Sequence, residues 1–209
     1  MSDFLRIISY HTNKLVYYKN FDGVTEQADE VVYDGIQMKS IGNPTLTFKN
    51  KNAKPSDYVM GIGMSSFPIV SSRFKDFLSS YLDKKYLQFF ECKTNYNKKE
   101  KFYAMNILET IDCFDWEKST YKKRTYAIDE NRFWADNITN VEFLNEKING
   151  RNIFRCTECS TNIFISKKIE EEILRQKFLV TLVRSQNIND IIDADSKNPI
   201  LASWGHENL

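Results

Sequence analysis

Cys156 and Cys159 have the spacing that comes closest to a metal or redox site in this chain. Two thiolates separated by two residues can bind one tetrahedral zinc ion, and the same spacing occurs in thiol–disulfide exchange sites. A structural zinc ion needs two more ligands, and Cys92 and Cys113 lie far upstream without a second paired spacing. The redox version of the motif opens a helix, whereas this pair lies between two strand-like runs. The pattern favours a turn with two free thiols, with zinc or redox chemistry as alternatives.

Asp112, Asp115 and Glu117 form a second group with chemical potential. Clustered carboxylates can bind a divalent cation or serve as general acid and base. No nucleophile, histidine or phosphate-binding loop accompanies them, which argues against an active site. The simpler interpretation is a polar turn that follows a strand at 102–108, with Trp116 as its apolar anchor.

Three further patterns are weak as functional signals. The glycines in residues 61–64 lack the third glycine of a dinucleotide loop and the Gly-Lys-Ser/Thr of a phosphate loop, so they predict a turn. The basic run Lys122–Arg124, beside two tyrosines, can contact a phosphate backbone, but a solvated strand edge explains it more simply. His11 and His206 lie near opposite ends of the chain, and we assign them no role.

The composition is that of one ordinary globular domain. The 209 residues are 42% hydrophobic and 27% charged, which is sufficient for a core. The 29 Lys and Arg nearly balance the 28 Asp and Glu. A net charge of +1 argues against a protein that binds nucleic acid through bulk charge.

The sequence also predicts the compartment. No window approaches the roughly 18 apolar residues of a membrane-spanning helix. The first apolar stretch contains Arg6 and is too short for the core of a signal peptide. We therefore expect a cytoplasmic protein with no membrane partner, no cofactor and four reduced cysteines.

Charge is distributed unevenly along this nearly neutral chain. Residues 22–34 contain no Lys or Arg and five acidic side chains, namely Asp22, Glu26, Asp29, Glu30 and Asp34. This stretch is expected to be a loop between two strands. Residues 93–101 contain four Lys and one Glu and are expected to form a solvated hairpin loop. Locally opposed charges suit a protein partner better than a polyanion.

Two helices are predicted from apolar periodicity. The first covers 72–82, where Phe74, Phe77 and Leu78 recur with helical spacing after a serine cap. The second covers about 167–176, after Ser166 as the cap.

The other regular elements are predicted as strands, because β-branched and aromatic runs alternate with turn residues. They are expected at 5–10, 15–18, 31–33, 46–48, 86–92, 102–108, 121–128, 153–156, 163–165 and 178–183. Many strands with two good helices predict an α+β domain with a mostly antiparallel sheet. Within this single domain, we expect residues 1–60 to be a strand-rich part, residues 61–185 to be the core and residues 186–209 to be a tail.

Three stretches, taken in order, resemble a family of bacterial immunity proteins that accompany polymorphic toxins. Residues 67–78 resemble the family's apolar-Ser-x-Arg-Phe-Lys pattern at the start of a helix. Residues 102–108 and 111–119 are similar to its Tyr-x-x-Asn-apolar and Asp-x-x-Asp-x-x-x-Ser segments. Ile153–Arg155 and Ile163–Ser166 are similar to the third stretch, although residues 176–180 lack the glycine that usually follows. The first 60 residues and the tail carry none of these motifs.

This resemblance implies an antidote that binds a cognate toxin, often a nuclease, and blocks it without catalysis of its own. The expected contact residues are acidic or aromatic, because carboxylates can imitate the phosphates that a nuclease binds. They are Asp22, Glu26, Asp29, Glu30, Asp34, Asp112, Asp115, Trp116 and Glu117. The basic loop 93–101 would instead suit an acidic toxin. Asn106, Asp112 and Ser119 also fit a role as turn and strand hydrogen-bonding residues.

The competing hypothesis is a nucleic-acid-processing enzyme or binding domain that uses Asp112, Asp115 and the Lys122–Arg124 run. A zinc-stabilised interaction module built on Cys156 and Cys159 is the third. The sequence indicates neither the toxin nor the oligomeric state.

Overall fold

A computed structural model describes residues 4–8, 18–52, 55–60, 66–82, 84–125, 133–184 and 187–193. The turn expected at 61–64 and both histidines lie outside these residues. No helix in the described part of the chain is long and apolar enough to cross a membrane.

The first large sheet brings the two ends of the described chain together. Its strand order is β14-β13-β1-β12-β11-β8. Strand β1 lies between β12 and β13 and is antiparallel to both, and only the short β8 is parallel to its neighbour, β11. The bounds are Phe4–Ile8 for β1, Thr110–Ile111 for β8, Ile153–Cys156 for β11, Ile163–Ser166 for β12, Thr181–Arg184 for β13 and Asn187–Asp193 for β14.

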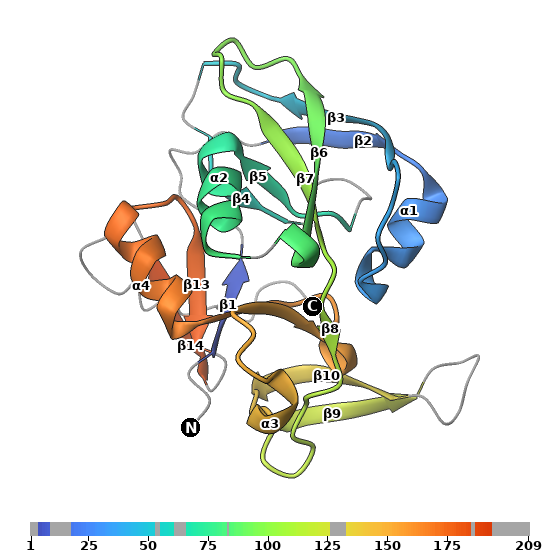
Figure 1. Cartoon of the computed structure of the whole chain (residues 1–209), viewed down its shortest axis with the longest axis vertical. Coiled ribbons are helices and arrows are strands. Elements are labelled where there is room, and N and C mark those ends of the chain that lie inside the picture. The colour runs from blue at the N-terminus through green and yellow to red at the C-terminus, as the bar shows by residue number, and fades with distance from the viewer. Residues whose placement is uncertain are drawn as a thin grey trace.

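The second large sheet occupies the upper part of Figure 1, with the order β2-β3-β6-β7-β5-β4. All its pairs are antiparallel except β3 with β6. The bounds are Tyr18–Val24 for β2, Gly42–Phe48 for β3, Tyr58–Val59 for β4, Ile69–Ser71 for β5, Leu87–Thr94 for β6 and Phe102–Ile107 for β7. Residues 95–101 join β6 to β7, so the expected basic hairpin loop is confirmed.

The remaining elements are a hairpin and short helices. Strands β9 (Thr120–Thr125) and β10 (Phe133–Asn140) form a two-stranded sheet at the bottom of Figure 1. The helices are α1 (Glu26–Val31), α2 (Ser72–Tyr81), α3 (Asn145–Ile148) and α4 (Lys167–Gln176). Three 3₁₀ turns complete the described elements, η1 (Val32–Asp34), η2 (Lys84–Tyr86) and η3 (Thr157–Cys159).

Both predicted helices are confirmed. The Ser71 hydroxyl caps α2 by accepting a hydrogen bond from the Phe74 amide at 3.2 Å. Phe74, Phe77 and Leu78 are buried as the periodicity predicts. Helix α4 begins after Ser166 and buries Ile169 and Ile173.

One hydrophobic core joins the two large sheets, which supports the single-domain prediction. It contains Val70 and Met105 from the second sheet, Ile7 and Ile163 from the first, and the buried faces of α2 and α4. A second cluster fills the space between α1 and the second sheet, and a third lies under β10 and α3. The fold is therefore α+β with mostly antiparallel sheets, as expected.

Two strand predictions are wrong. Residues 31–33 belong to α1 and η1, because Ala28 and Val32, four residues apart, turn toward the core from one helical face. Residues 178–180 form a turn, because Lys177 adopts a left-handed conformation and the Phe178 amide donates back to Ile173 at 3.3 Å. The closing strand accordingly begins only at Thr181.

Asp57 connects the start of α2 to the segment before β13. Its carboxylate, 8% exposed, accepts hydrogen bonds from the Ser71 hydroxyl at 2.6 Å and from the Leu179 amide at 2.7 Å. It also pairs with the Arg73 guanidinium at 3.0 Å. The guanidinium carbon of Arg73 lies 4.3 Å from the centre of the Phe178 ring. The Ser-x-Arg pattern at residues 71–73 therefore holds the fold together.

Arg155 on β11 is a buried cation, and the residues found beside it in the described part of the chain are tyrosines, not carboxylates. Its side chain is fully buried, with one nitrogen donating to the Ser160 carbonyl at 2.6 Å and the guanidinium stacked 5.1 Å from the Tyr33 ring. Its Nε and Nη2 atoms have no hydrogen-bond partner among the residues that the structure describes. Burial lowers the pKa of Arg155, as expected for a cation in an apolar setting.

Replacement of Arg155 with methionine is expected to raise the free energy of unfolding by about 1 kcal/mol or more, because a linear apolar side chain removes a desolvated charge. Urea denaturation of both proteins measures this difference. The matched control is Arg151→Met, whose part-exposed side chain pairs with Glu109 at 3.0 Å; this change should not stabilise the protein. A clear loss of stability in Arg155→Met would contradict the expectation.

Candidate functional site

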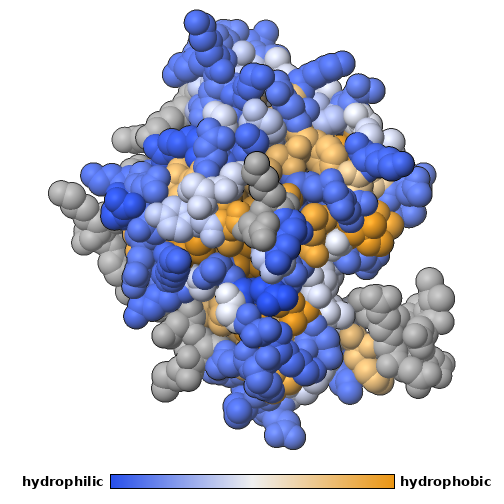
Figure 2. All heavy atoms as spheres, viewed as in Figure 1, coloured by the Kyte–Doolittle hydropathy of each residue, from blue (hydrophilic) through white to orange (hydrophobic). Residues whose placement is uncertain are grey.

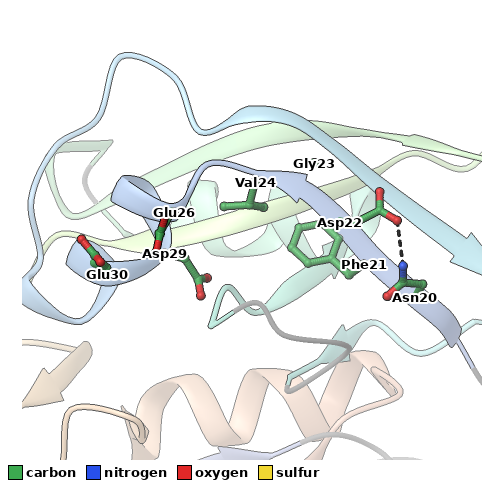
Figure 3. Close-up of a pocket in the computed structure, with 8 residues that line it drawn as sticks. All are labelled: Asn20, Phe21, Asp22, Gly23, Val24, Glu26, Asp29 and Glu30. Atoms are coloured by element: carbon green, nitrogen blue, oxygen red, sulfur yellow. Dashed lines mark hydrogen bonds between the residues drawn. The ribbon is translucent and has the colours of Figure 1, made fainter.

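A cavity of about 570 Å³ lies where β2 meets α1, and we call it the acidic groove (Figure 3). Its lining consists of the consecutive residues 20–24 with three side chains of α1, namely Asn20, Phe21, Asp22, Gly23, Val24, Glu26, Asp29 and Glu30. Four of these eight residues are acidic and none is basic. The acidic stretch singled out in the sequence therefore borders a cavity, although it is a strand end and a helix rather than the expected loop.

Local sequence explains why this segment changes from strand to helix at Thr25. Its hydroxyl accepts a hydrogen bond from the Ala28 amide at 3.3 Å and caps α1. Glu26 and Asp29 stand in the first turn, where negative charge is favoured by the helix dipole. Because Ala28 and Val32 point into the core, the acidic side chains remain on the outer face.

Two glycines hold the end of β2 close to β3. Gly23 has a φ of +77° and Gly42 a φ of +100°, both in the left-handed region. A Cβ atom on Gly23 would lie 2.1 Å from the Asn43 carbonyl oxygen. The pairing between β2 and β3 shifts register here, between Asp22 and Val24. The strand is therefore irregular where it borders the groove.

The four groove carboxylates differ in their surroundings. Asp29 is half-buried and accepts a hydrogen bond from the Ser66 amide at 2.7 Å, so it fixes the neighbouring segment. Asp22 is exposed and accepts a hydrogen bond from the Asn20 amide group at 2.7 Å. Glu26 and Glu30 are also exposed. Asp22, Glu26 and Glu30 are therefore the carboxylates available to a partner.

The acidic segment ends at η1, which contacts β8. Asp34 is exposed at the end of η1, and the neighbouring Tyr33 carbonyl accepts a hydrogen bond from the Thr110 hydroxyl at 3.2 Å. The buried Asn106 donates to the Ile36 carbonyl at 2.8 Å and fixes the chain just beyond. The motif residue Asn106 is thus a positioning residue for the acidic segment.

The second acidic patch is less available than the sequence suggests. Asp115 is buried, accepts hydrogen bonds from the Glu117 and Lys118 amides at 3.1 Å, and pairs with the Lys118 ammonium at 3.1 Å. Burial raises its pKa, but these contacts outweigh that effect and hold the pKa below its usual value. Asp115 therefore closes the polar turn that the sequence predicts.

The neighbours of Asp115 divide between surface and core. Asp112 is exposed and pairs with the Lys147 ammonium at 2.9 Å, and Glu117 is exposed. Trp116 is half-buried, with its ring 4.8 Å from that of Phe114 and 5.0 Å from that of Tyr121. Of this group, only Asp112 and Glu117 present charge to a partner.

The sequence pair Cys156 and Cys159 lies in a buried thiol cluster that also includes Cys113, and all three are free. Hydrogen bonding to Cys156 raises the pKa of Cys113, which the sequence did not place near the pair. The Cys156 sulfur lies 3.1 Å from Oε2 of Glu158, and burial raises the pKa of that carboxyl to about 9. Among the described residues, no group of three or more His, Cys, Asp or Glu side chains is arranged to hold a metal ion.

The basic candidates lie on exposed elements. Lys122–Arg124 is part of β9, and Arg124 pairs with Asp136 of β10 at 3.1 Å. The Lys123 ammonium lies 3.9 Å from the centre of the Phe133 ring. This arrangement is the solvated strand that the sequence favours. In the hairpin loop, Lys98 and Lys99 are exposed, while Lys101 pairs with Glu91 at 2.9 Å.

Comparison with known proteins gives one family. A model of the immunity protein family (Imm11) matches residues 10–188. This match includes most of the first 60 residues, which the three sequence motifs did not reach, and it therefore contains the acidic groove. No curated protein matches the chain. Since the match covers most of its length, the chain belongs to the immunity protein family Imm11.

Proposed function

We propose that this protein binds a cognate toxin in the cytoplasm and neutralises it without catalysis, with the acidic groove as the contact surface. The observation that carries the proposal is a cavity bordered by the exposed carboxylates of Asp22, Glu26 and Glu30. The surrounding sequence, residues 20–38, contains no Lys or Arg that would neutralise them. Family membership supports toxin neutralisation as the function.

The groove combines the two features that protein recognition requires. Exposed carboxylates steer a basic partner and reject an acidic one, which affects the association rate most strongly. Val24, half-buried, gives the lining an apolar component, and Ile36 nearby in the chain is 49% exposed. Figure 2 shows apolar side chains gathered on the side of the molecule where α1 lies, among hydrophilic ones. A toxin that binds nucleic acid has the basic surface that fits these features.

The proposal is tested by reversing the groove charge. The variant Asp22→Lys/Glu26→Lys/Glu30→Lys is expected to weaken the Kd for the toxin about 100-fold or more, mainly through slower association. We expect the toxin to be the C-terminal domain of the protein encoded immediately upstream, and this domain is the binding partner to be tested. Binding is measured by surface plasmon resonance at two salt concentrations, and neutralisation by growth of cells that express the toxin with each variant.

The matched control reverses three charges of the opposite sign at the end of β6 and in the hairpin loop, Lys93→Glu/Lys98→Glu/Lys99→Glu. It should leave affinity and growth rescue near the wild-type level. Loss of rescue in this control, with full rescue by the groove variant, would assign the contact to the basic loop. Failure of the wild-type protein to bind the toxin would overturn the proposed function.

The structure gives less support to a nucleic-acid-processing activity. The Asp115 carboxylate is engaged by two amides and Lys118, and Arg124 is engaged by Asp136. Nuclease activity of the purified chain that disappears in Asp112→Asn, with unchanged thermal stability, would favour that alternative instead.

A further inference from the structure

Strand β2 is an edge of the second sheet. In the described part of the chain it pairs with β3 alone. A strand directs alternate backbone N–H and C=O groups toward each side, so an edge strand has a row of these groups that faces away from its neighbour. Such a row can accept a further strand from another protein.

The acidic groove follows this edge. Five consecutive residues of β2, Asn20 to Val24, line the cavity. Successive side chains of a strand point to opposite faces of the sheet. A cavity bordered by all five therefore runs along the edge of the strand rather than over one face, and Figure 3 shows α1 continuing directly from its end.

From this geometry we infer that the toxin adds an extended segment bearing Lys or Arg to the free edge of β2, an inference that rests on the proposed function. The backbone groups of residues 20–24 would pair with the incoming segment. Its basic side chains would meet Asp22, Glu26 and Glu30, which gives the interaction its specificity.

The irregularities of β2 limit the length over which an incoming segment can pair, and they disfavour other partners. The pairing with β3 shifts register between Tyr18 and Asn20 and again between Asp22 and Val24. The regular span between these shifts is short, so the added segment pairs over only a few residues. Bulges and like charges also discourage the edges of two copies from pairing with each other. A basic segment of another protein is thus the occupant that the edge favours.

Amide hydrogen exchange of the full chain, with and without the toxin domain, tests the inference. In the complex, backbone amides among residues 20–24 should exchange at least 10-fold more slowly. Amides of β4, at the opposite edge of the sheet, should be unchanged. The variant Asp22→Asn/Glu26→Gln/Glu30→Gln should bind more weakly but show the same protection at saturating toxin, because its backbone is intact.

The outcomes separate the two proposals. A toxin that binds and neutralises without slowing exchange at residues 20–24 would overturn strand addition and leave the proposed function in place. Absence of any binding would overturn the proposed function itself. Protection of these amides that depends on the concentration of the chain alone would show that a second copy occupies the edge, and would also overturn the inference.

Discussion

Asp57→Ala is expected to lower the free energy of unfolding by about 3–5 kcal/mol, because it removes an acceptor shared by two buried donors and one guanidinium. The Leu179 amide and the Ser71 hydroxyl would each lose their contact with this carboxylate. Arg73 would lose its ion-pair partner. The loss is large because the contacts connect segments 122 residues apart in the sequence.

Urea denaturation followed by circular dichroism measures this effect. The conservative variant Asp57→Asn keeps one acceptor oxygen and should fall between alanine and the wild type. The matched control is Asp76→Ala on α2, whose 74% exposed side chain pairs only with Lys75; it should change stability by less than about 0.5 kcal/mol. Equal effects of Asp57→Ala and Asp76→Ala would show that the buried contacts do not stabilise the fold.

Gly23→Ala is expected to lower the free energy of unfolding by about 3 kcal/mol or more. It should also weaken toxin neutralisation. The left-handed backbone conformation alone costs a non-glycine residue about 1–2 kcal/mol. In addition, the new Cβ would lie 2.1 Å from the Asn43 carbonyl oxygen, so β2 and β3 must separate. This separation moves Asp22 and the edge that borders the acidic groove.

Gly150→Ala is the control that isolates the backbone effect. Gly150 also has a positive φ, +74°, but among the described residues no atom beyond its immediate chain neighbours lies within 4 Å of the position of its Cβ. Gly150→Ala should lower the free energy of unfolding by only about 1–2 kcal/mol and leave neutralisation intact. Thermal denaturation and growth rescue of both variants provide the comparison. If the two variants lose the same stability, the close approach of β2 and β3 has no energetic importance.

The elements that could be predicted from sequence are those that carry their own periodicity and caps. Helix α2 has Ser71 as cap and Phe74, Phe77 and Leu78 on one face. Helix α4 has the same apolar periodicity, but the Ser166 hydroxyl before it donates to Asn152 and does not cap the helix. Strand β11 was predicted with its observed bounds, because β-branched and aromatic residues are concentrated there. Sheet order was not predictable, since the partners of β1 are about 155 residues or more away in the sequence.

The acidic segment shows where local pattern fails. Its valines and tyrosine at 31–33 favour a strand, but Thr25 caps a helix there and Val32 is buried against the second sheet. Charge composition nevertheless identified the segment that borders the groove. The register shift at Gly23, which borders the cavity, arises in the pairing with β3 and could not be predicted from local sequence.

The other site predictions separate by burial, which composition does not reveal. Asp115 and Asp22 are both aspartates in acidic stretches of the sequence, but Asp115 is buried within its own turn. Cys113 joins Cys156 and Cys159 only because the chain returns to the same cluster after 43 residues. Motif residues such as Ser71, Asn106 and Asp115 prove to hold the fold, so a place in a family motif does not by itself identify a contact residue.

The central place of β1 has a consequence for synthesis. Phe4–Ile8 is translated long before both its neighbours, β12 and β13, which lie within residues 163–184. At roughly 5–20 residues per second, a ribosome needs on the order of 10–30 s to complete them. During that time β1 has neither neighbour, and folding that depends on such distant contacts is intrinsically slow. The first large sheet therefore cannot be completed until residues 163–184 have been translated.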